Sequence, residues 1–136
     1  MKKILLGLIL GIVLVSCGAI SGVNSKLGKS QTMLNNTEWE LSGEKVGSSR
    51  TPILKIEEGR ISGNAGCNNY FSQVTLDEQS GAFSAKNIGV TRMACKEMQV
   101  EQNFLKMLEE ANQYVSDGKT LELYKNQLLL MKFTRK

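Results

Sequence analysis

A run of glycine and asparagine wrapped around one cysteine constrains this chain more than any other feature. The run occupies residues 61–71 and reads I-S-G-N-A-G-C-N-N-Y-F. Gly and Asn adopt left-handed backbone conformations at the lowest cost, so their density around Cys67 predicts a tightly wound turn. A second short element, V-T-R-M-A-C, follows at residues 90–95 and ends in Cys95. We expect the fold to be organised around these two segments.

The N-terminal segment is typical of a bacterial lipoprotein signal. Lys2 and Lys3 make its beginning positive, residues 4–15 are apolar, and L-V-S-C ends the segment at Cys17. This ending resembles a lipobox, in which the cysteine thiol receives a diacylglyceryl group and the chain is cut on the N-terminal side of that cysteine. We therefore expect Cys17 to be lipidated and to carry acyl chains such as palmitate.

The sequence then divides into three parts. Residues 1–16 form the signal peptide, residues 17–36 the lipidated cysteine with a flexible tether, and residues 37–136 one folded domain. An uncleaved membrane anchor is the alternative, because residues 4–23 carry no charge and about 20 apolar residues can span a bilayer. Gly18 follows the cysteine, with no Asp there to indicate inner-membrane retention. We therefore expect a lipid-anchored envelope protein of the outer membrane that faces the periplasm.

The charge balance gives no case for nucleic-acid binding. Without Lys2 and Lys3 the 17 basic residues fall to 15, against 13 acidic ones, and the basic residues are scattered. Nucleic-acid-binding domains instead concentrate Lys and Arg in a patch or stripe. Hydrophobic residues make up 41% of the chain and proline occurs once, which is typical of an ordinary globular domain.

Alternating polar and apolar residues predict a mainly β domain. We expect strands or extended chain at residues 37–42, 53–57, 60–62, 70–76, 82–86, 87–93, 113–116, 121–124 and 128–134. Asp117 and Gly118 lie between two of these segments, and Asp-Gly is a strong hairpin signal. The predicted fold class is therefore α+β and mainly β. It is a curled, barrel-like antiparallel sheet of about seven or eight strands with one amphipathic helix packed on it.

The hydrophobic period changes to that of a helix after Cys95. Between residues 96 and 112 apolar side chains recur at three- and four-residue spacing, at Val100, Phe104, Met107, Leu108 and Ala111. On this pattern Glu101 faces water together with Lys106, Glu109 and Glu110. The methionines expected to fill gaps in the core are Met93, Met98, Met107 and Met131.

These residues resemble the META-domain family, which includes the HslJ heat-shock lipoproteins. The resemblance rests on Trp39, on residues 61–71, on V-T-R-M-A-C at residues 90–95, and on Glu101 with the F-L pair that follows it. The closing segments L-E-L-Y and L-L-L-M-K-F complete it. The resemblance implies a compact β-rich fold with one helix and an envelope role linked to stress tolerance. It brings no established catalytic activity.

The residue inventory argues against an enzyme. The sequence contains no histidine, which excludes Ser-His-Asp and Cys-His sites and removes the commonest metal ligand. Two cysteines without histidine do not make a zinc site, and no C-x-x-C supports thioredoxin-type chemistry. We therefore expect no catalytic residues, no metal and no cofactor, and the wide spacing of the cysteines disfavours a thiol redox enzyme.

Cys67 and Cys95 remain once Cys17 is lipidated. In an oxidising compartment they predict a disulfide that closes a loop of about 29 residues and stabilises the fold by roughly 3–4 kcal/mol on the chain-entropy model. The alternative is two buried free thiols that pack as small hydrophobes, because spacing alone does not determine disulfide geometry.

Five polar residues of the two segments are candidates for a binding surface. They are Asn64, Asn68, Asn69, Thr91 and Arg92. A structural role is the alternative: the Asn side chains would cap the backbone of their own turn, while Thr91 and Arg92 would tie the turn to the neighbouring strand.

Two functional hypotheses follow from these patterns. The first is a non-enzymatic, monomeric envelope protein that touches the membrane through its lipid and acts on an unidentified envelope protein partner. The second is a carrier that holds an apolar small molecule or acyl chain inside a small β-barrel. The large apolar side chains suffice to fill a domain of about 100 residues, which favours a closed core.

Overall fold

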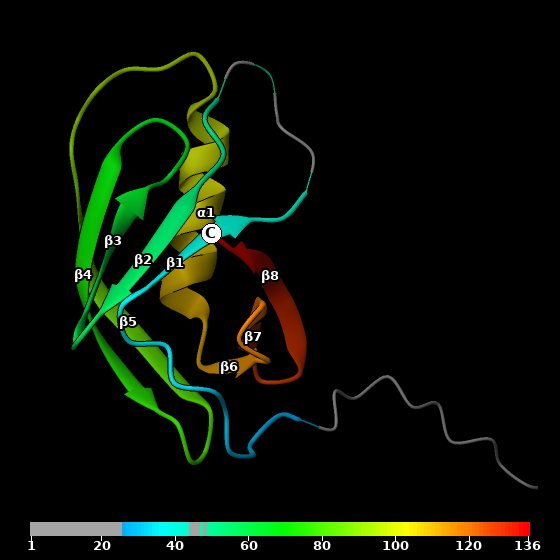
Figure 1. The fold of residues 1–136 in the computed structure, drawn as a ribbon. Helices are drawn as coiled ribbons and strands as arrows, with labels where there is room; N and C mark the ends of the chain where they lie inside the picture. Colours follow the sequence, from blue (N-terminus) through cyan, green and yellow to red (C-terminus); the bar gives the residue numbers. More distant parts are fainter. Residues whose placement is uncertain (1–25, 44–46, 48) are drawn as a thin grey trace, which may run out of the picture.

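A closed barrel of antiparallel strands forms the body of the computed structural model, which describes residues 26–43, 47 and 49–136. Its strands follow one another in chain order, and one helix connects the fifth strand to the sixth (Figure 1). The elements are β1 (Thr37–Leu41), β2 (Ile53–Glu57), β3 (Arg60–Asn64), β4 (Asn69–Asp77), β5 (Ala82–Val90), α1 (Met98–Glu110), β6 (Gln113–Ser116), β7 (Thr120–Lys125) and β8 (Leu128–Arg135). The predicted fold class is confirmed.

Alternation along several strands, clearest in β4, separates side chains that fill the interior of the barrel from side chains on its outside. In β4 every second residue from Tyr70 to Val74 is buried, while its neighbours are exposed. Successive side chains of a strand point to opposite faces, so this pattern sends one set inward. Trp39 of β1 and Phe133 of β8 are fully buried in the same core. Trp39, the one tryptophan of the sequence, is therefore a core residue.

The barrel is weakly closed between β5 and β6, and helix α1 completes the core there. These two strands share a single residue pair, Ala82 with Gln113, whereas β4 pairs with β5 over most of its length. Figure 1 shows α1 running between the group β2–β5 and the group β6–β8. From α1, the ring of Phe104 lies 5.4 Å from that of Tyr70 and 6.3 Å from that of Phe133, centroid to centroid. The helix is therefore part of the core and not only a cover.

The chain touches the barrel before the first strand begins. Leu34 is 1% exposed and belongs to the core. The backbone N–H of Gln31 donates to the carbonyl of Glu78 at 2.7 Å, and the side-chain oxygen of Gln31 accepts from the N–H of Ser116 at 3.0 Å. The segment expected to serve as a tether thus contacts the domain at Gln31 and Leu34.

The turn between β6 and β7 is built around Asp117. One carboxylate oxygen accepts from the N–H of Thr120 at 2.7 Å and from the N–H of Lys119 at 2.9 Å. These hydrogen bonds, with the Thr120 N–H as the largest cause, lower the pKa of Asp117 to about 2. Hydrogen bonds to a carboxylate favour its charged form and so lower its pKa.

This lowered pKa predicts a pH-dependent contribution to stability. Because the folded-state pKa lies below the unfolded value of about 3.9, the contribution is complete above that value and disappears as the pH falls toward about 2. We expect Asp117→Ala to lower the free energy of unfolding at pH 6 and to lower it by less at pH 2.5. Urea unfolding of both proteins at the two pH values measures this, and an equal loss at both would contradict it.

Candidate functional site

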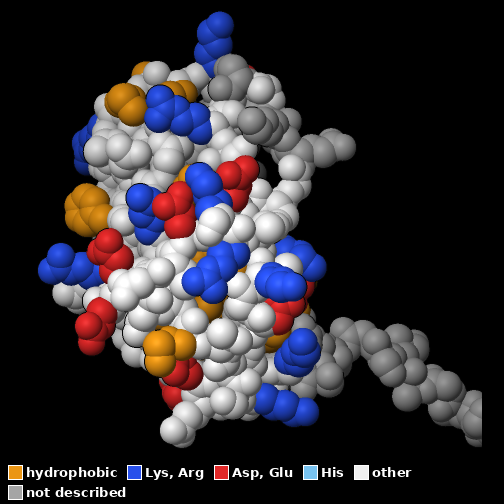
Figure 2. All heavy atoms as spheres, viewed as in Figure 1, with side chains coloured by type: hydrophobic (Ala, Val, Ile, Leu, Met, Phe, Trp, Pro, Cys, Tyr) orange, Lys and Arg blue, Asp and Glu red, His pale blue; other side chains and the backbone are white. Residues whose placement is uncertain are grey.

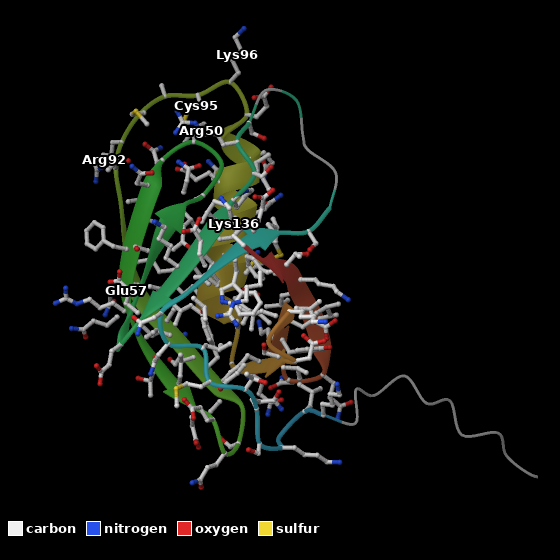
Figure 3. All side chains as sticks on the ribbon, viewed as in Figure 1. Arg50, Glu57, Arg92, Cys95, Lys96 and Lys136 are labelled. Atoms are coloured by element: carbon white, nitrogen blue, oxygen red, sulfur yellow. A yellow bond between two sulfur atoms is a disulfide. The ribbon has the colours of Figure 1, made fainter. Side chains whose placement is uncertain are left out.

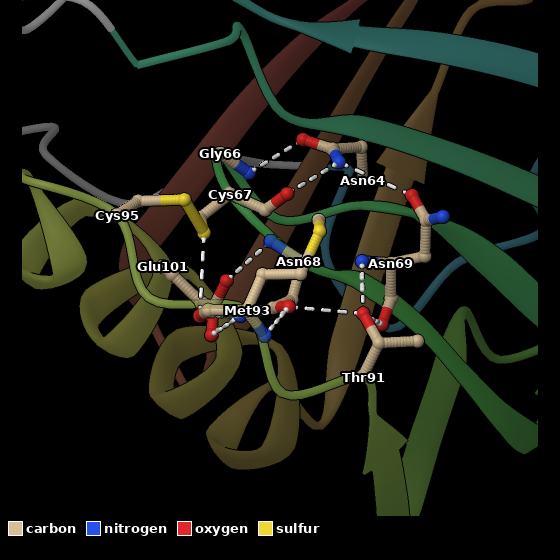
Figure 4. The surroundings of a disulfide bond; sticks show 9 residues. All are labelled: Asn64, Gly66, Cys67, Asn68, Asn69, Thr91, Met93, Cys95 and Glu101. Atoms are coloured by element: carbon tan, nitrogen blue, oxygen red, sulfur yellow. Dashed lines mark hydrogen bonds between the residues drawn. A yellow bond between two sulfur atoms is a disulfide. The ribbon is translucent and has the colours of Figure 1, made fainter.

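The turn between β3 and β4 is held by the side chain of Asn64. Its oxygen accepts from the N–H of Gly66 at 2.9 Å, and its amide donates to the carbonyl of Cys67 and to the side-chain oxygen of Asn69, both at 3.1 Å (Figure 4). Both donors of this amide are therefore used inside the turn. Gly66 has a φ of +113°, a backbone conformation that L side chains rarely adopt.

Asn68 links this turn to the segment that follows β5. Its side-chain oxygen accepts from the N–H of Met93 at 2.7 Å and from the hydroxyl of Thr91 at 3.0 Å. Its amide donates to the carbonyl of Met93 at 3.0 Å and to Glu101 at 3.1 Å. A side-chain amide has two donors and two acceptor lone pairs, and all four are used here. Asn68 is 1% exposed and has no capacity left for a ligand.

Glu101 of α1 is the third member of this network. It is 4% exposed, and its carboxylate accepts from the backbone N–H of Asn68 at 2.6 Å and from the Asn68 amide at 3.1 Å. A buried carboxylate needs such donors because it has lost its water. The prediction that Glu101 faces water is wrong. It shares a helix face with Phe104 and Leu108, three and seven residues further on, and that spacing was visible in the sequence.

A disulfide joins the same two segments. Cys67 and Cys95 are bonded, with their Cα atoms 6.1 Å apart. Cys67 is buried, whereas Cys95 lies at the surface. The segment of residues 91–95 is thus fixed to the turn by one covalent bond and by the hydrogen bonds of Asn68.

A groove lies between this fixed segment and helix α1. One wall is the continuous chain of residues 88–94, the other is formed by Met98, Glu101 and Leu105 of α1, and Asn68 contributes between them. Ile88, Val90 and Leu105 are half-buried and make its walls apolar. Met93 on its rim is 52% exposed, so the prediction that Met93 fills a gap in the core is wrong. The backbone of Met93 is held against Asn68, and its side chain projects outward.

Basic side chains project around this end of the molecule. Arg92 and Lys96 extend away from the barrel near Cys95, and Arg50 lies close by (Figure 3). Arg92 and Lys96 are exposed, and neither makes a hydrogen bond or ion pair with any residue in the described part of the chain. Figure 2 shows Lys and Arg side chains beside hydrophobic ones at this end.

The structure brings the five candidate binding residues together but gives them different tasks. Asn64 and Asn68 cap the turn. The hydroxyl of Thr91 accepts from the N–H of Asn69 at 3.1 Å, which ties the turn to the segment after β5. Arg92 does not take part in this network and remains available at the edge of the groove. Cys17, the expected lipidation site, lies outside the described residues.

Two further features concern metal binding and membrane crossing in the part of the chain that the structure describes. Residues 26–43, 47 and 49–136 contain no group of three His, Cys, Asp or Glu side chains that could hold a metal ion. Over the same residues, no helix has the length and apolarity needed to cross a bilayer.

Comparisons with known proteins address the family and the fold. The family model of the META domain matches residues 32–136. An NMR structure of a protein from Burkholderia xenovorans is 23% identical, covers 76% of this chain and 83% of its own, and superposes with a TM-score of 0.63. A second NMR structure is 22% identical, covers 74% and 90% respectively, and has a TM-score of 0.58. At such identities the likeness concerns the fold alone. No curated protein matched the chain.

The network predicts a specific cost for altering Glu101. In Glu101→Gln one carboxylate oxygen becomes an NH₂ group that faces a donor of Asn68, so we expect a loss of roughly 1.5–3 kcal/mol in the free energy of unfolding. Glu109→Gln is the matched control, because Glu109 is an exposed carboxylate on the same helix; we expect it to change stability by less than about 0.5 kcal/mol. Urea unfolding with the disulfide intact measures both. Equal effects would mean that Glu101 is not held as described.

Proposed function

The chain belongs to the META-domain family, and on this premise we propose that it is a non-enzymatic protein, anchored by lipid in the cell envelope, that acts by binding other envelope proteins. The lipid is attached at Cys17, where the sequence has its lipobox-like L-V-S-C. The anchored protein is a monomer of the outer membrane and faces the periplasm. Its link to stress tolerance rests on the resemblance to the HslJ lipoproteins.

The observation that carries this proposal is the division between a filled interior and a surface groove. Five large side chains occupy the inside of the barrel, and each is at most 1% exposed: Trp39, Tyr70, Phe104, Tyr114 and Phe133. Close-packed interiors leave no room for a guest molecule. Three partly accessible apolar side chains, those of Ile88, Val90 and Leu105, lie along the groove between residues 88–94 and α1. A protein with a filled interior and a surface groove binds its partners through its surface.

The same packing weighs against the carrier hypothesis. A carrier needs free volume lined by small side chains, as in larger barrels that enclose a ligand. Here the rings of Tyr70, Phe104 and Phe133 pack against one another, tilted and edge to face, across the space that an acyl chain would need. No feature of the described residues favours this second function.

The chemistry of the site supports a role without catalysis. The sequence has no histidine. Cys67 and Cys95 are joined to each other, so neither is a free thiolate nucleophile. The carboxylate of Glu101 accepts hydrogen bonds from Asn68, and the side chain of Asn68 has all its donors and acceptors in use. The polar groups at the base of the groove therefore fix the backbone.

Lipid anchoring is tested by metabolic labelling of the full-length protein in a Gram-negative host. We expect labelled palmitate to be incorporated into the wild type, which should fractionate with the outer membrane, and to be absent from Cys17→Ser. Cys67→Ser/Cys95→Ser is the matched control, because it removes two cysteines but leaves the lipobox-like sequence intact; it should still be labelled. An unlabelled wild type would overturn the anchoring proposal.

A further inference from the structure

The segment after β5 continues the edge of the sheet beyond the last strand pair. The N–H of Thr91 donates to the carbonyl of Asn69 on β4 at 3.0 Å. Two residues later, Met93 uses both its N–H and its carbonyl on the side chain of Asn68. The Asn68 amide thus takes the place that the peptide group of a neighbouring strand would have. The backbone N–H groups of residues 91 and 93 therefore point toward the barrel, as those of alternate residues in a paired strand do.

The backbone groups of the residue before Thr91 and of the residue between Thr91 and Met93 point the other way. In an antiparallel pair the residues alternate between bonding to the neighbour and facing away from it. Because Thr91 and Met93 bond inward, the N–H and carbonyl groups of Val90 and Arg92 face outward, along the groove. Strand β6 cannot satisfy them, since it pairs with β5 only at Ala82, at the far end of that strand. The result is a short, open sheet edge beside an apolar helix face.

The side chains around this edge specify what can occupy it. Leu105 and Met98 of α1 lie opposite the edge and offer apolar contact. Arg92 supplies a positive charge on the edge itself, with no acidic partner in the described part of the chain. The one carboxylate in the groove, that of Glu101, is already bound to Asn68 and does not neutralise Arg92. An incoming strand therefore needs apolar residues on the face toward α1 and an acidic residue near Arg92.

We propose that this groove binds an extended, acidic segment of a partner protein, which adds as a strand to the edge formed by residues 90–94. Main-chain hydrogen bonds to Val90 and Arg92 supply affinity, and alternate side chains of the segment enter the groove and supply specificity. About five residues at roughly 3.3 Å each match the length of the edge. This inference rests on the proposed role as a protein-binding envelope protein and names the chemistry of the bound segment.

The test is a binding screen on the full-length lipidated protein in detergent micelles. The probe is a pool of capped octapeptides with Val, Ile, Leu or Phe at alternate positions, Thr or Ser between them, and Asp or Lys at one end. We expect Asp-ended peptides to be selected over Lys-ended ones. Methylating the backbone nitrogens that face the edge should weaken the best binder about tenfold or more, because N-methylation removes the donors but keeps the side chains.

Reversing the charge at residue 92 provides a second test of the same binding mode. Arg92→Glu should weaken the best Asp-ended peptide about tenfold and reverse the preference toward its Lys-ended counterpart. Arg60→Glu, an exposed arginine on β3, should leave binding unchanged. Failure to select any peptide would overturn the proposal, as would binding that survives N-methylation. So would Arg92-dependent binding to phosphatidylglycerol vesicles with no peptide binding, which would assign the groove to a membrane surface.

These outcomes remain separable from those of the anchoring experiment. Palmitate labelling and outer-membrane fractionation do not involve the groove. A labelled protein that selects no peptide would therefore keep its envelope role and lose only the proposed mode of strand addition.

Discussion

The hydrogen bonds between Asn68 and Glu101 are the interaction on which the rest of this site depends. Together with the hydrogen bonds between Asn68 and Met93, they connect three pieces of chain that are distant in sequence: the turn between β3 and β4, the segment after β5, and the first half of α1. A buried carboxylate and a buried amide each need complete hydrogen bonding, and here each supplies what the other lacks. Because each of these buried groups has hydrogen-bond partners, the network fixes the relative positions of the three pieces. The disulfide between Cys67 and Cys95 reinforces the same connection covalently.

The position of this network explains how the groove beside α1 arises. The barrel closes poorly between β5 and β6, and α1 fills the opening with Phe104 and Leu108. At the end near Glu101 the helix is held by polar contacts instead of by further apolar packing. The edge of residues 90–94 is then left beside the helix without a strand to cover it. Native sheets usually protect such edges, so an open one beside an apolar helix face is a natural place for a partner.

Most of the fold could be predicted from the sequence because its strands, helix and turn follow from the pattern of residues close together in the chain. Alternation predicts the strands, the change of period predicts α1, and the Gly and Asn residues around Cys67 predict the turn. The errors at Glu101 and Met93 have a different origin. An amphipathic pattern counts every carboxylate as solvent-facing, and the donor that allows Glu101 to be buried belongs to Asn68, 33 residues earlier. Met93 faces outward because Asn68 holds its backbone, a contact that no local pattern contains.

The proposed strand-binding site depends on the alternation of backbone bonding along residues 90–93, and amide hydrogen exchange on the folded protein reports on this alternation residue by residue. The N–H of Thr91 and the N–H of Met93 donate to Asn69 and Asn68 at 3.0 and 2.7 Å, so both should be protected from exchange. The N–H of Arg92, between them, should exchange much faster, because it faces the groove. Asn68→Ala should remove the protection of Met93. Equal protection of Arg92 and its two neighbours would mean that the edge is not open, and the assignment of the groove as a strand-binding site would be wrong.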